Sequence, residues 1–275
     1  MKYYLKDFLG GILVVILTIL TMNFITLDLR IVTFLIAILL MGYAYFFIKK
    51  RNLKWLSIIL LVLPIATAFY FGILPELPGM WMAIVFFLFA AVIGYSASIK
   101  KVVFLGMALF AVFSFYIVPG IVEDNLSEHG NEAAPEVQFI SIENGKMTSL
   151  KDFEAHVLVL DFFGTWCAPC IKEMDELKRV QEHFRDNSKV EIILVCTEQG
   201  GDTPDKVHPF MMKHNLDFKA YFDTGNVSHR NLKFTGVPAL VILDQRGNVR
   251  FRHEGYNPSE NLAKNLIDFI NTLLP

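Results

Sequence analysis

Two of the three cysteines in the chain, Cys167 and Cys170, are separated by two residues in the segment GTWCAPC. Two thiols at this spacing can form a structural disulfide, supply half of a metal site or act as a redox pair. A zinc site needs about four ligands, and outside this pair the sequence offers only Cys196 and scattered histidines. A disulfide between such near neighbours closes too short a loop to restrain much of the unfolded chain. The redox pair is therefore the favoured interpretation, and the other two remain open alternatives.

The position of the pair in the chain predicts different roles for the two thiols. An apolar run typical of a buried strand, HVLVLDFF, precedes it, and residues 171–184 carry apolar side chains at helical spacing. A cysteine at the start of a helix faces unpaired N–H groups and the positive end of the helix dipole, which stabilise its thiolate. Cys167 is thus the predicted nucleophile, and Cys170, one turn further in, is the predicted resolving thiol. Cys196 lies in a second apolar run and is expected to be an inert core thiol.

The C-terminal half alternates strands with helices around this pair. Residues 137–150 alternate apolar and polar side chains about Asn144-Gly145, which is typical of a hairpin. Such an order predicts an α/β layer structure with some parallel pairing, completed by an antiparallel hairpin. The later expected elements are a helix over 204–215, a strand over 218–223, two strands over 238–255 and a helix over 259–274 with Ser259 as its N-cap.

The N-terminal half has the composition of a membrane domain. A helix needs roughly 20 apolar residues to cross the hydrocarbon core of a bilayer. Five stretches without Asp, Glu, Lys or Arg meet this length, so we expect an all-α domain of five transmembrane spans. They cover residues 8–27, 31–48, 55–75, 77–99 and 102–122.

Charges predict how these spans are oriented. Residues 1–122 carry nine Lys/Arg and three Asp/Glu, a net charge of +6, whereas the remainder has a net charge of −8. Under simple alternation, the basic segments before span 1, after span 2 and after span 4 all fall on one side, which the positive-inside rule makes the cytoplasm. Everything after residue 122 then lies outside. A cleaved signal peptide is the alternative for the N-terminus, but the first span lacks an Ala-x-Ala site and four more spans follow.

Three regions follow from these patterns. Residues 1–122 form the predicted transmembrane domain, residues 123–134 a polar linker and residues 135–275 the α/β domain. The membrane half contains no cysteine, and no ionisable residue lies deep in a predicted span, so we expect it to act as an anchor or a docking surface. Neither half has the basic face expected of a nucleic-acid-binding protein.

The segments VLDFFGTWCAPC and, about seventy residues later, TGVPALVILDQRGNV resemble the thioredoxin superfamily. Within it, they are most similar to the membrane-anchored TlpA/ResA-like disulfide reductases. The resemblance covers residues 134–275 and implies a thioredoxin-like fold with an N-terminal β-hairpin and a central αβ insertion over 203–223.

This resemblance also implies roles for individual residues. Cys167 and Cys170 match the redox-active disulfide, and Trp166 matches the tryptophan beside it. Pro238 matches the cis-proline that lies against the pair. Val237 then offers backbone hydrogen bonds to a substrate strand, so Trp166 and Val237 are the expected substrate-binding residues.

Two acidic residues match catalytic positions of the family. Asp161 matches the buried acid of thioredoxins, and Glu173 matches the acid near the cysteines of ResA-like reductases. A carboxyl group in an apolar strand has a raised pKa, which suits Asp161 to accept a proton from Cys170. The alternatives are an Asp161 at a solvated sheet edge and a Glu173 that serves only the helix dipole.

The sequence therefore predicts a thiol–disulfide oxidoreductase of the bacterial plasma membrane that needs no metal or other cofactor. We expect it to reduce disulfides of extracytoplasmic proteins, an apocytochrome being one candidate, and to be reduced again by a separate membrane thiol reductant. The lipid bilayer is a further expected partner, and nucleic acid is not. Two alternatives remain: a peroxiredoxin-like thiol peroxidase and a non-enzymatic redox-sensing or binding module.

Overall fold

The computed structural model describes residues 2–51, 55–96, 100–154 and 156–274. These residues form two compact units. Unit 1 comprises Met1–Asn125 with Asn257–Glu260, and unit 2 comprises Leu126–Tyr256 with Asn261–Pro275.

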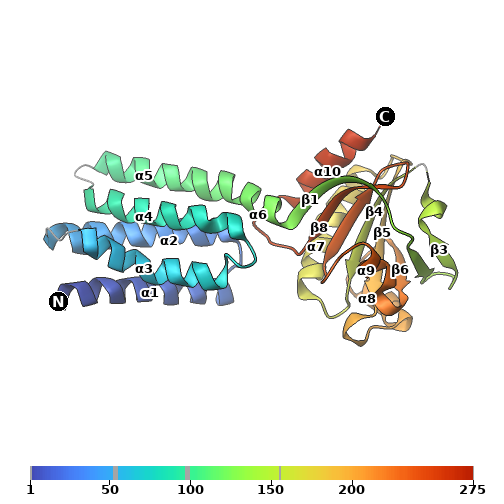
Figure 1. Ribbon diagram of the computed structural model, residues 1–275, viewed down its shortest axis with the longest axis horizontal. Coiled ribbons are helices and arrows are strands. Elements are labelled where there is room, and N and C mark those ends of the chain that lie inside the picture. The colour runs from blue at the N-terminus through green and yellow to red at the C-terminus, as the bar shows by residue number, and fades with distance from the viewer. Residues whose placement is uncertain (1, 52–54, 97–99, 155, 275) are drawn as a thin grey trace. The chain divides into compact units, whose positions relative to one another are not determined.

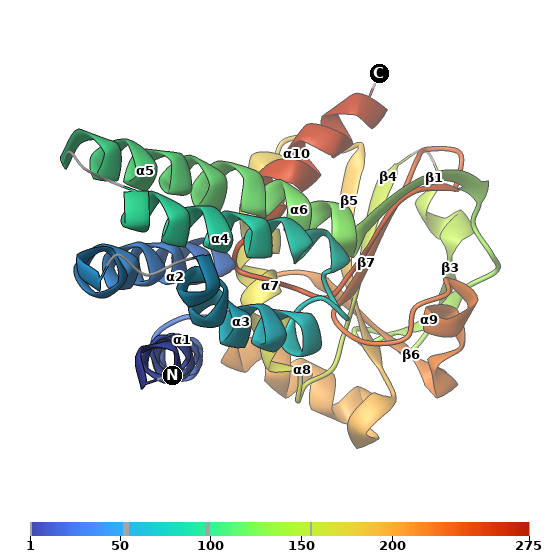
Figure 2. The ribbon, with the colours of Figure 1, turned by 60° about the vertical axis from the view of Figure 1, so that its left-hand side comes forward.

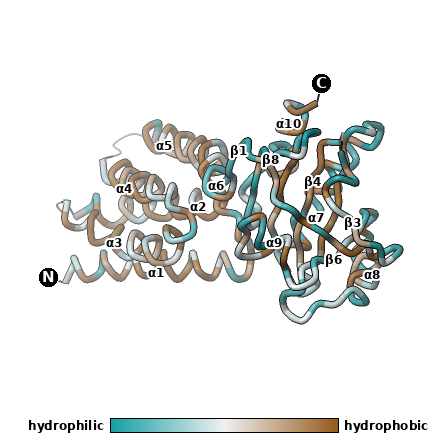
Figure 3. The backbone as a smooth tube through the Cα atoms, turned by 45° about the vertical axis from the view of Figure 1, so that its right-hand side comes forward, coloured by the Kyte–Doolittle hydropathy of each residue, from teal (hydrophilic) through white to brown (hydrophobic). Residues whose placement is uncertain are grey.

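Unit 1 is built from long helices (Figure 1). Among the described residues, five helices are long and apolar enough to cross a membrane, which confirms the predicted number. These five helices consist largely of hydrophobic residues (Figure 3). Residues 52–54, at the end of the basic connection after the second predicted span, lie outside the described residues, as do residues 97–99, at the end of the fourth predicted span. The helices are α1 (Lys2–Phe24), α2 (Leu29–Tyr43), α3 (Trp55–Gly72), α4 (Trp81–Ser96) and α5 (Lys100–Val112), with π-helical turns at Ala44–Ile48 and Phe113–Ile117 and a final α6 (Val118–Leu126).

Glycines let the helices of unit 1 approach closely. Helix α4 packs against α2, α3 and α5, and α1 packs against α3 (Figure 2). A Cβ atom on Gly94 of α4 would lie 2.1 Å from the carbonyl oxygen of Met41, and one on Gly11 of α1 would lie 2.2 Å from that of Leu61. Small residues at such contacts are typical of membrane helices, which associate through close packing.

Unit 2 contains a mixed sheet with the strand order β1-β8-β7-β4-β5-β6-β2-β3. Strands β4, β5 and β6 are parallel, and every other neighbouring pair is antiparallel. The strands are β1 (Ser127–Ala133), β2 (Gln138–Ser141), β3 (Met147–Ser149), β4 (Val157–Phe163), β5 (Val190–Thr197), β6 (Lys219–Asp223), β7 (Ala239–Leu243) and β8 (Asn248–Glu254). The helices are α7 (Ala168–His183), α8 (Pro204–Lys213), α9 (Val227–Asn231) and α10 (Leu262–Leu273).

The central strand β4 explains why this sheet is buried on both faces. Side chains alternate along a strand, so Val157, Val159 and Phe163 join the core beneath α7, α8 and α10. The intervening Leu158, Leu160 and Phe162 join a second core on the opposite face. Strand β4 lies between β5 and β7 and is fully buried. These layers are the α/β thioredoxin-like fold that the sequence predicts.

The hairpin and the insertion expected from the sequence are both present. Strands β2 and β3 pair antiparallel, with Gly145 at φ +68° in the turn between them. Helix α8 and strand β6 occupy the predicted insertion over residues 203–223.

Two expectations were wrong in detail. The predicted linker over residues 123–134 is regular structure, because α6 extends to Leu126 and Ser127–Ala133 pair with β8 as β1. Its polar composition reflects an edge strand whose residues are mostly exposed. Helix α10 begins at Leu262, after Asn261, so Ser259 is not its N-cap.

Candidate active site

The redox pair lies at the junction between β4 and α7. Cys167 is the N-cap of α7, with an extended backbone at φ −83° and ψ 99°. A disulfide joins Cys167 to Cys170, whose Cα atoms are 5.3 Å apart. The Cys170 N–H group also donates to Cys167 Sγ at 3.2 Å. Pro169 lies in the first turn, where its missing N–H costs little.

A second loop brings Val237 and Pro238 to this disulfide. The Val237–Pro238 peptide bond is cis, as the resemblance implied. Cys167 Sγ lies 3.6 Å from the Val237 carbonyl oxygen. The Gly255 N–H donates to the Pro238 carbonyl at 2.8 Å and ties this loop to the end of β8.

Trp166 is exposed beside the pair, with 54% of its surface accessible. Its Nε1–H donates to the Gln199 carbonyl at 2.9 Å. Gly200 has φ +66°, and a Cβ there would lie 2.2 Å from Trp166 Nε1. Gly200 therefore permits both the left-handed turn and the close seat of the indole ring.

The two predicted acids lie on the α7 face of the sheet. Asp161 occupies the same side of β4 as Val159 and Phe163, and its cross-strand neighbours Leu194 and Leu240 belong to the core beneath α7. Asp161 is fully buried, and neither of its carboxyl oxygens has a hydrogen-bond partner among the described residues. Burial raises the pKa of Asp161 well above its ordinary value because water no longer stabilises the charge.

Glu173 is also fully buried and stands three residues after Cys170 on α7. Positions three apart on a helix share a face. The structure thus brings Cys170, Glu173 and Asp161 to the layer between α7 and the sheet. On the other side of the disulfide, Trp166 is exposed and Val237 is partly exposed, whereas Pro238 and Cys167 itself are buried.

Several residues around the site were missed by sequence reasoning. The backbone N–H of Thr165 donates to Asp202 Oδ2 at 2.8 Å, and its hydroxyl donates to Asp202 Oδ1 at 2.6 Å. Asp202 is 3% exposed. In the sequence it stands two residues before Pro204, where an acidic residue suggests only the start of a helix, so spacing gave no signal of its contact with Thr165.

Cys196, in β5, is buried next to Asp202. Its Sγ lies 3.7 Å from Asp202 Oδ2. Burial, followed by the nearby Asp202 charge, raises the pKa of the Cys196 thiol. A thiol that stays protonated is a poor nucleophile, which agrees with the expectation of an inert core thiol.

Glu254 and His229 hold the second loop. One oxygen of Glu254, Oε1, accepts from the Thr235 hydroxyl at 2.6 Å, from the Thr235 N–H at 2.9 Å and from the Gly236 N–H at 2.8 Å. The buried His229 Nε2 lies 2.8 Å from the Gly236 carbonyl oxygen. Nothing in the local sequence linked Glu254, at the end of β8, to Thr235.

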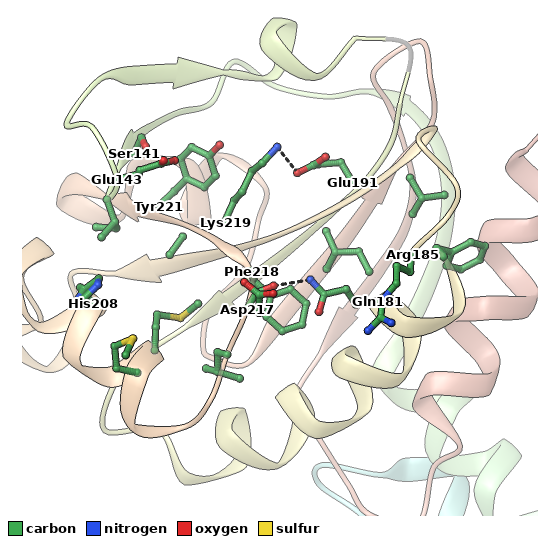
Figure 4. A pocket seen from close by; sticks show the side chains of 18 of the residues that line it. Ser141, Glu143, Gln181, Arg185, Glu191, His208, Asp217, Phe218, Lys219 and Tyr221 are labelled. Atoms are coloured by element: carbon green, nitrogen blue, oxygen red, sulfur yellow. Dashed lines mark hydrogen bonds and ion pairs between the residues drawn. The ribbon is translucent and has the colours of Figure 1, made fainter.

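A cavity of about 700 Å³ lies elsewhere in unit 2 (Figure 4). It is bordered by the last turns of α7 and the first residues of β5 and β6, so it is at the opposite end of α7 from Cys167. Lys219 and Glu191 form an ion pair of 2.9 Å across its rim. None of the predicted site residues lines it.

The C-terminal half of the chain is similar to known proteins. The family model described as Redoxin matches residues 128–267, which include the disulfide and the cis-proline. The thiol–disulfide oxidoreductase ResA of Bacillus cereus is 29% identical over 168 residues, covering 58% of this chain and 94% of that protein. ResA of Bacillus thuringiensis is 30% identical over 122 residues, covering 44% of this chain and 68% of that protein. A solved secreted thiol–disulfide isomerase from Corynebacterium glutamicum is 20% identical, with a TM-score of 0.46, covering 54% of this chain and 91% of that chain.

The chain belongs to the Redoxin family. Within this family, its ResA relatives identify it as a ResA-like thiol–disulfide oxidoreductase, as the sequence resemblance implied.

Proposed function

We propose that the chain is a membrane-anchored disulfide reductase that acts on extracytoplasmic proteins. The observation that carries this proposal is the Cys167–Cys170 disulfide at the start of α7, with Cys167 Sγ beside the Val237 carbonyl. Both sulfurs are buried, but Cys167 is next to the exposed Trp166 and the partly exposed Val237, which favours Cys167 as the thiol that meets a substrate.

The reaction is a two-step exchange. In the reduced chain, the Cys167 thiolate attacks one sulfur of a substrate disulfide, forms a mixed disulfide and releases the other substrate sulfur as a thiolate. Cys170 then loses its proton and attacks Cys167 Sγ, which releases the second substrate sulfur. The substrate gains two electrons, and the chain gains the Cys167–Cys170 disulfide. A separate membrane thiol reductant supplies two electrons to restore the dithiol.

Buried carboxyl groups suit the proton transfers in this cycle. Burial raises the pKa of Asp161, which makes its carboxylate a stronger base than that of an exposed aspartate. We assign Asp161 as the group that takes the Cys170 proton, and Glu173, on the same helix face as Cys170, as an acid that assists.

Substrate binding is assigned to the rim of the site. An extended peptide lying along Val237 can pair with its backbone and bring a disulfide to Cys167, while the exposed Trp166 supplies an apolar contact. Pro238 lies directly after Val237 and fixes the direction of this segment.

The five apolar helices support a plasma-membrane anchor. Basic residues in the connections that fall on one side favour a cytoplasmic N-terminus and an extracytoplasmic redox unit, by the positive-inside rule. Disulfides persist in that compartment, and exported cysteine proteins such as apocytochromes are the proposed substrates.

The test is disulfide reduction by the full chain in detergent with a dithiol reductant. Wild type should reduce a disulfide-bonded protein, and the double variant Cys167→Ala/Cys170→Ala should not. A Cys167/Cys170 potential well above that of protein disulfide isomerase would reverse the proposed direction of electron flow. Rapid peroxide turnover would instead support a thiol peroxidase.

A further inference from the structure

Two carboxylates hold the two loops that meet at the disulfide, and their contacts follow the same pattern. Asp202 accepts from the N–H and hydroxyl of Thr165, which is two residues before Cys167. Glu254 accepts from the N–H and hydroxyl of Thr235, which is two residues before Val237. The loop held by Asp202 leads to Cys167, and the loop held by Glu254 leads to Val237. Cys167 Sγ and the Val237 carbonyl oxygen are 3.6 Å apart.

We infer that Asp202 and Glu254 are positioning residues that fix Cys167 and Val237 relative to each other. The inference rests on the proposed function, since it assigns a role to that same site. Neither carboxylate touches the disulfide sulfurs in any described contact. Each acts through a threonine.

The first clamp, formed by Asp202 and Thr165, leaves Cys167 little freedom. Both Asp202 oxygens are used by Thr165, and the next residue, Trp166, is bonded to the Gln199 carbonyl of the same loop. With consecutive residues held, Cys167 is kept as the N-cap of α7, where the helix terminus stabilises a thiolate. Loss of the clamp should let Cys167 leave this position.

The second clamp, formed by Glu254 and Thr235, holds the substrate side of the site. Glu254 Oε1 also accepts from the Gly236 N–H, and the Gly236 carbonyl lies 2.8 Å from His229 Nε2. Both backbone polar groups of the residue before Val237 are thereby engaged. Loss of this clamp should affect substrate docking more than thiol chemistry.

A link between the two loops is also present. The Glu198 N–H donates to Asn226 Oδ1 at 2.6 Å, and Glu198 Oε2 accepts from the Gly225 N–H. Asn226 directly precedes α9, which carries His229. Hydrogen-bonded segments therefore run from the loop that holds Trp166 to the loop that holds Val237.

The first test uses the pH dependence of Cys167 alkylation in the reduced full chain in detergent. Iodoacetamide is the probe, and mass spectrometry identifies the Cys167 adduct. The other charged or titratable groups near this loop are Cys196, Lys206, which donates to the Gly201 carbonyl, Glu198 and the buried Asp161 and Glu173. All stay unchanged, so each variant is compared with wild type under identical conditions.

The sign of the alkylation shift separates geometry from charge. Asp202→Ala removes both the hydrogen bonds to Thr165 and the negative charge. We expect the pH midpoint of Cys167 alkylation to move to higher pH, because Cys167 loses the helix terminus. Asp202→Asn keeps the shape but removes the charge; its amide oxygen can still accept from the Thr165 N–H, and its amide NH2 group can donate to the Thr165 hydroxyl oxygen. The midpoint of this variant should therefore stay in place or move to lower pH. A downward shift in both variants would mean that only the charge matters and would overturn the inference, as would an unchanged midpoint in Asp202→Ala.

Asp244→Ala is the matched control. Asp244 similarly accepts from backbone N–H groups, those of Arg246 and Asn248, but in the turn between β7 and β8. Asp244→Ala should destabilise the fold without moving the pH midpoint of Cys167 alkylation. An equal shift in this control would show that the Asp202→Ala effect is only general destabilisation, which would contradict the inference. Since alkylation needs no protein substrate, this test stands even if the chain reduces no disulfide.

The second test concerns Glu254 and uses disulfide-reduction kinetics. Glu254→Ala should raise KM for a disulfide peptide about tenfold, which corresponds to about 1.4 kcal/mol, because Thr235 and Gly236 lose their shared hydrogen-bond acceptor. The alkylation midpoint should not change, and Glu254→Gln should restore most of the affinity. An unchanged KM in Glu254→Ala, or no rescue by glutamine, would contradict the assignment.

Discussion

The sulfur of Cys167 lies 3.6 Å from the carbonyl oxygen of Val237, although 70 positions separate the two residues in the sequence. They meet because β4 and β7 are adjacent strands, so the segment that follows β4 and the segment that precedes β7 emerge at the same end of the sheet. The site is therefore an assembly of two loops on a rigid sheet. A disulfide presented along Val237 would reach Cys167 first.

This order of contact predicts that Cys170→Ala traps substrate. The variant retains the Cys167 nucleophile but lacks the thiol that resolves the mixed disulfide. A Cys167–substrate adduct should accumulate and be visible by non-reducing electrophoresis and mass spectrometry. Cys196→Ala is the control and should turn over like wild type, because that thiol is buried and its pKa is raised. Adducts formed by Cys167→Ala instead would assign the nucleophile to Cys170.

Asp161→Asn should stabilise the oxidised chain at neutral pH and slow disulfide reduction. The raised pKa of Asp161 means that the folded chain holds this proton more tightly than the unfolded chain. Its stabilising contribution is full below the unfolded pKa of about 3.9 and is lost, by up to about 1.4 kcal/mol per pH unit, as pH rises towards the folded pKa. Asparagine has no carboxyl proton to lose in this range. The amount by which Asp161→Asn is more stable than wild type in thermal unfolding should therefore grow from pH 4 to pH 7. An advantage that is constant across this range would contradict burial of a titrating carboxyl group.

Gly200→Ala should disturb Trp166 more than Gly201→Ala does. Both glycines have positive φ values, so both substitutions carry a conformational cost of about 1 kcal/mol. Only at Gly200 would the added Cβ lie 2.2 Å from the indole; at Gly201 it meets nothing within 4 Å. We expect a larger loss of thermal stability and slower disulfide reduction for Gly200→Ala. Equal effects would show that the indole seat contributes nothing.

Gly94→Leu should destabilise the helical unit, whereas Gly42→Leu should not. A Cβ on Gly94 would contact the backbone of Met41 at 2.1 Å, while one on Gly42 meets nothing within 4 Å. Overpacking costs typically 1–3 kcal/mol, and about this much or more is expected where the obstacle is backbone. Thermal unfolding of the full chain in detergent measures the difference, and similar midpoints for both variants would contradict the described packing.

The proposed orientation predicts that a membrane-impermeant maleimide labels reduced Cys167 in intact cells. A permeant maleimide on the same cells is the control for accessibility. Labelling by the permeant reagent alone would place the redox unit in the cytoplasm and reject the extracytoplasmic proposal.

The elements whose sequence patterns are local were predictable. Five apolar stretches, the alternation around Asn144-Gly145 and the fully apolar run of β4 each contain their own structural signal, because hydrophobic periodicity depends on neighbouring residues. The edge strand β1 was missed since its residues are mostly exposed and its stability comes from pairing with β8, more than 110 positions later. Ser259 was a plausible N-cap by its residue type alone, but α10 begins at Leu262 and its N-cap is Asn261.

Sequence by itself determined the chemistry of this protein, because CAPC after a buried strand and Gly-Val-Pro before another define a redox pair and the loop expected to lie against it. Tertiary structure alone decided what holds that pair in place. Asp202 lies 37 positions after Thr165 and Glu254 lies 19 positions after Thr235. Their hydrogen bonds exist only because neighbouring strands end at one edge of the sheet, and no periodicity along a single segment encodes a contact between separate segments.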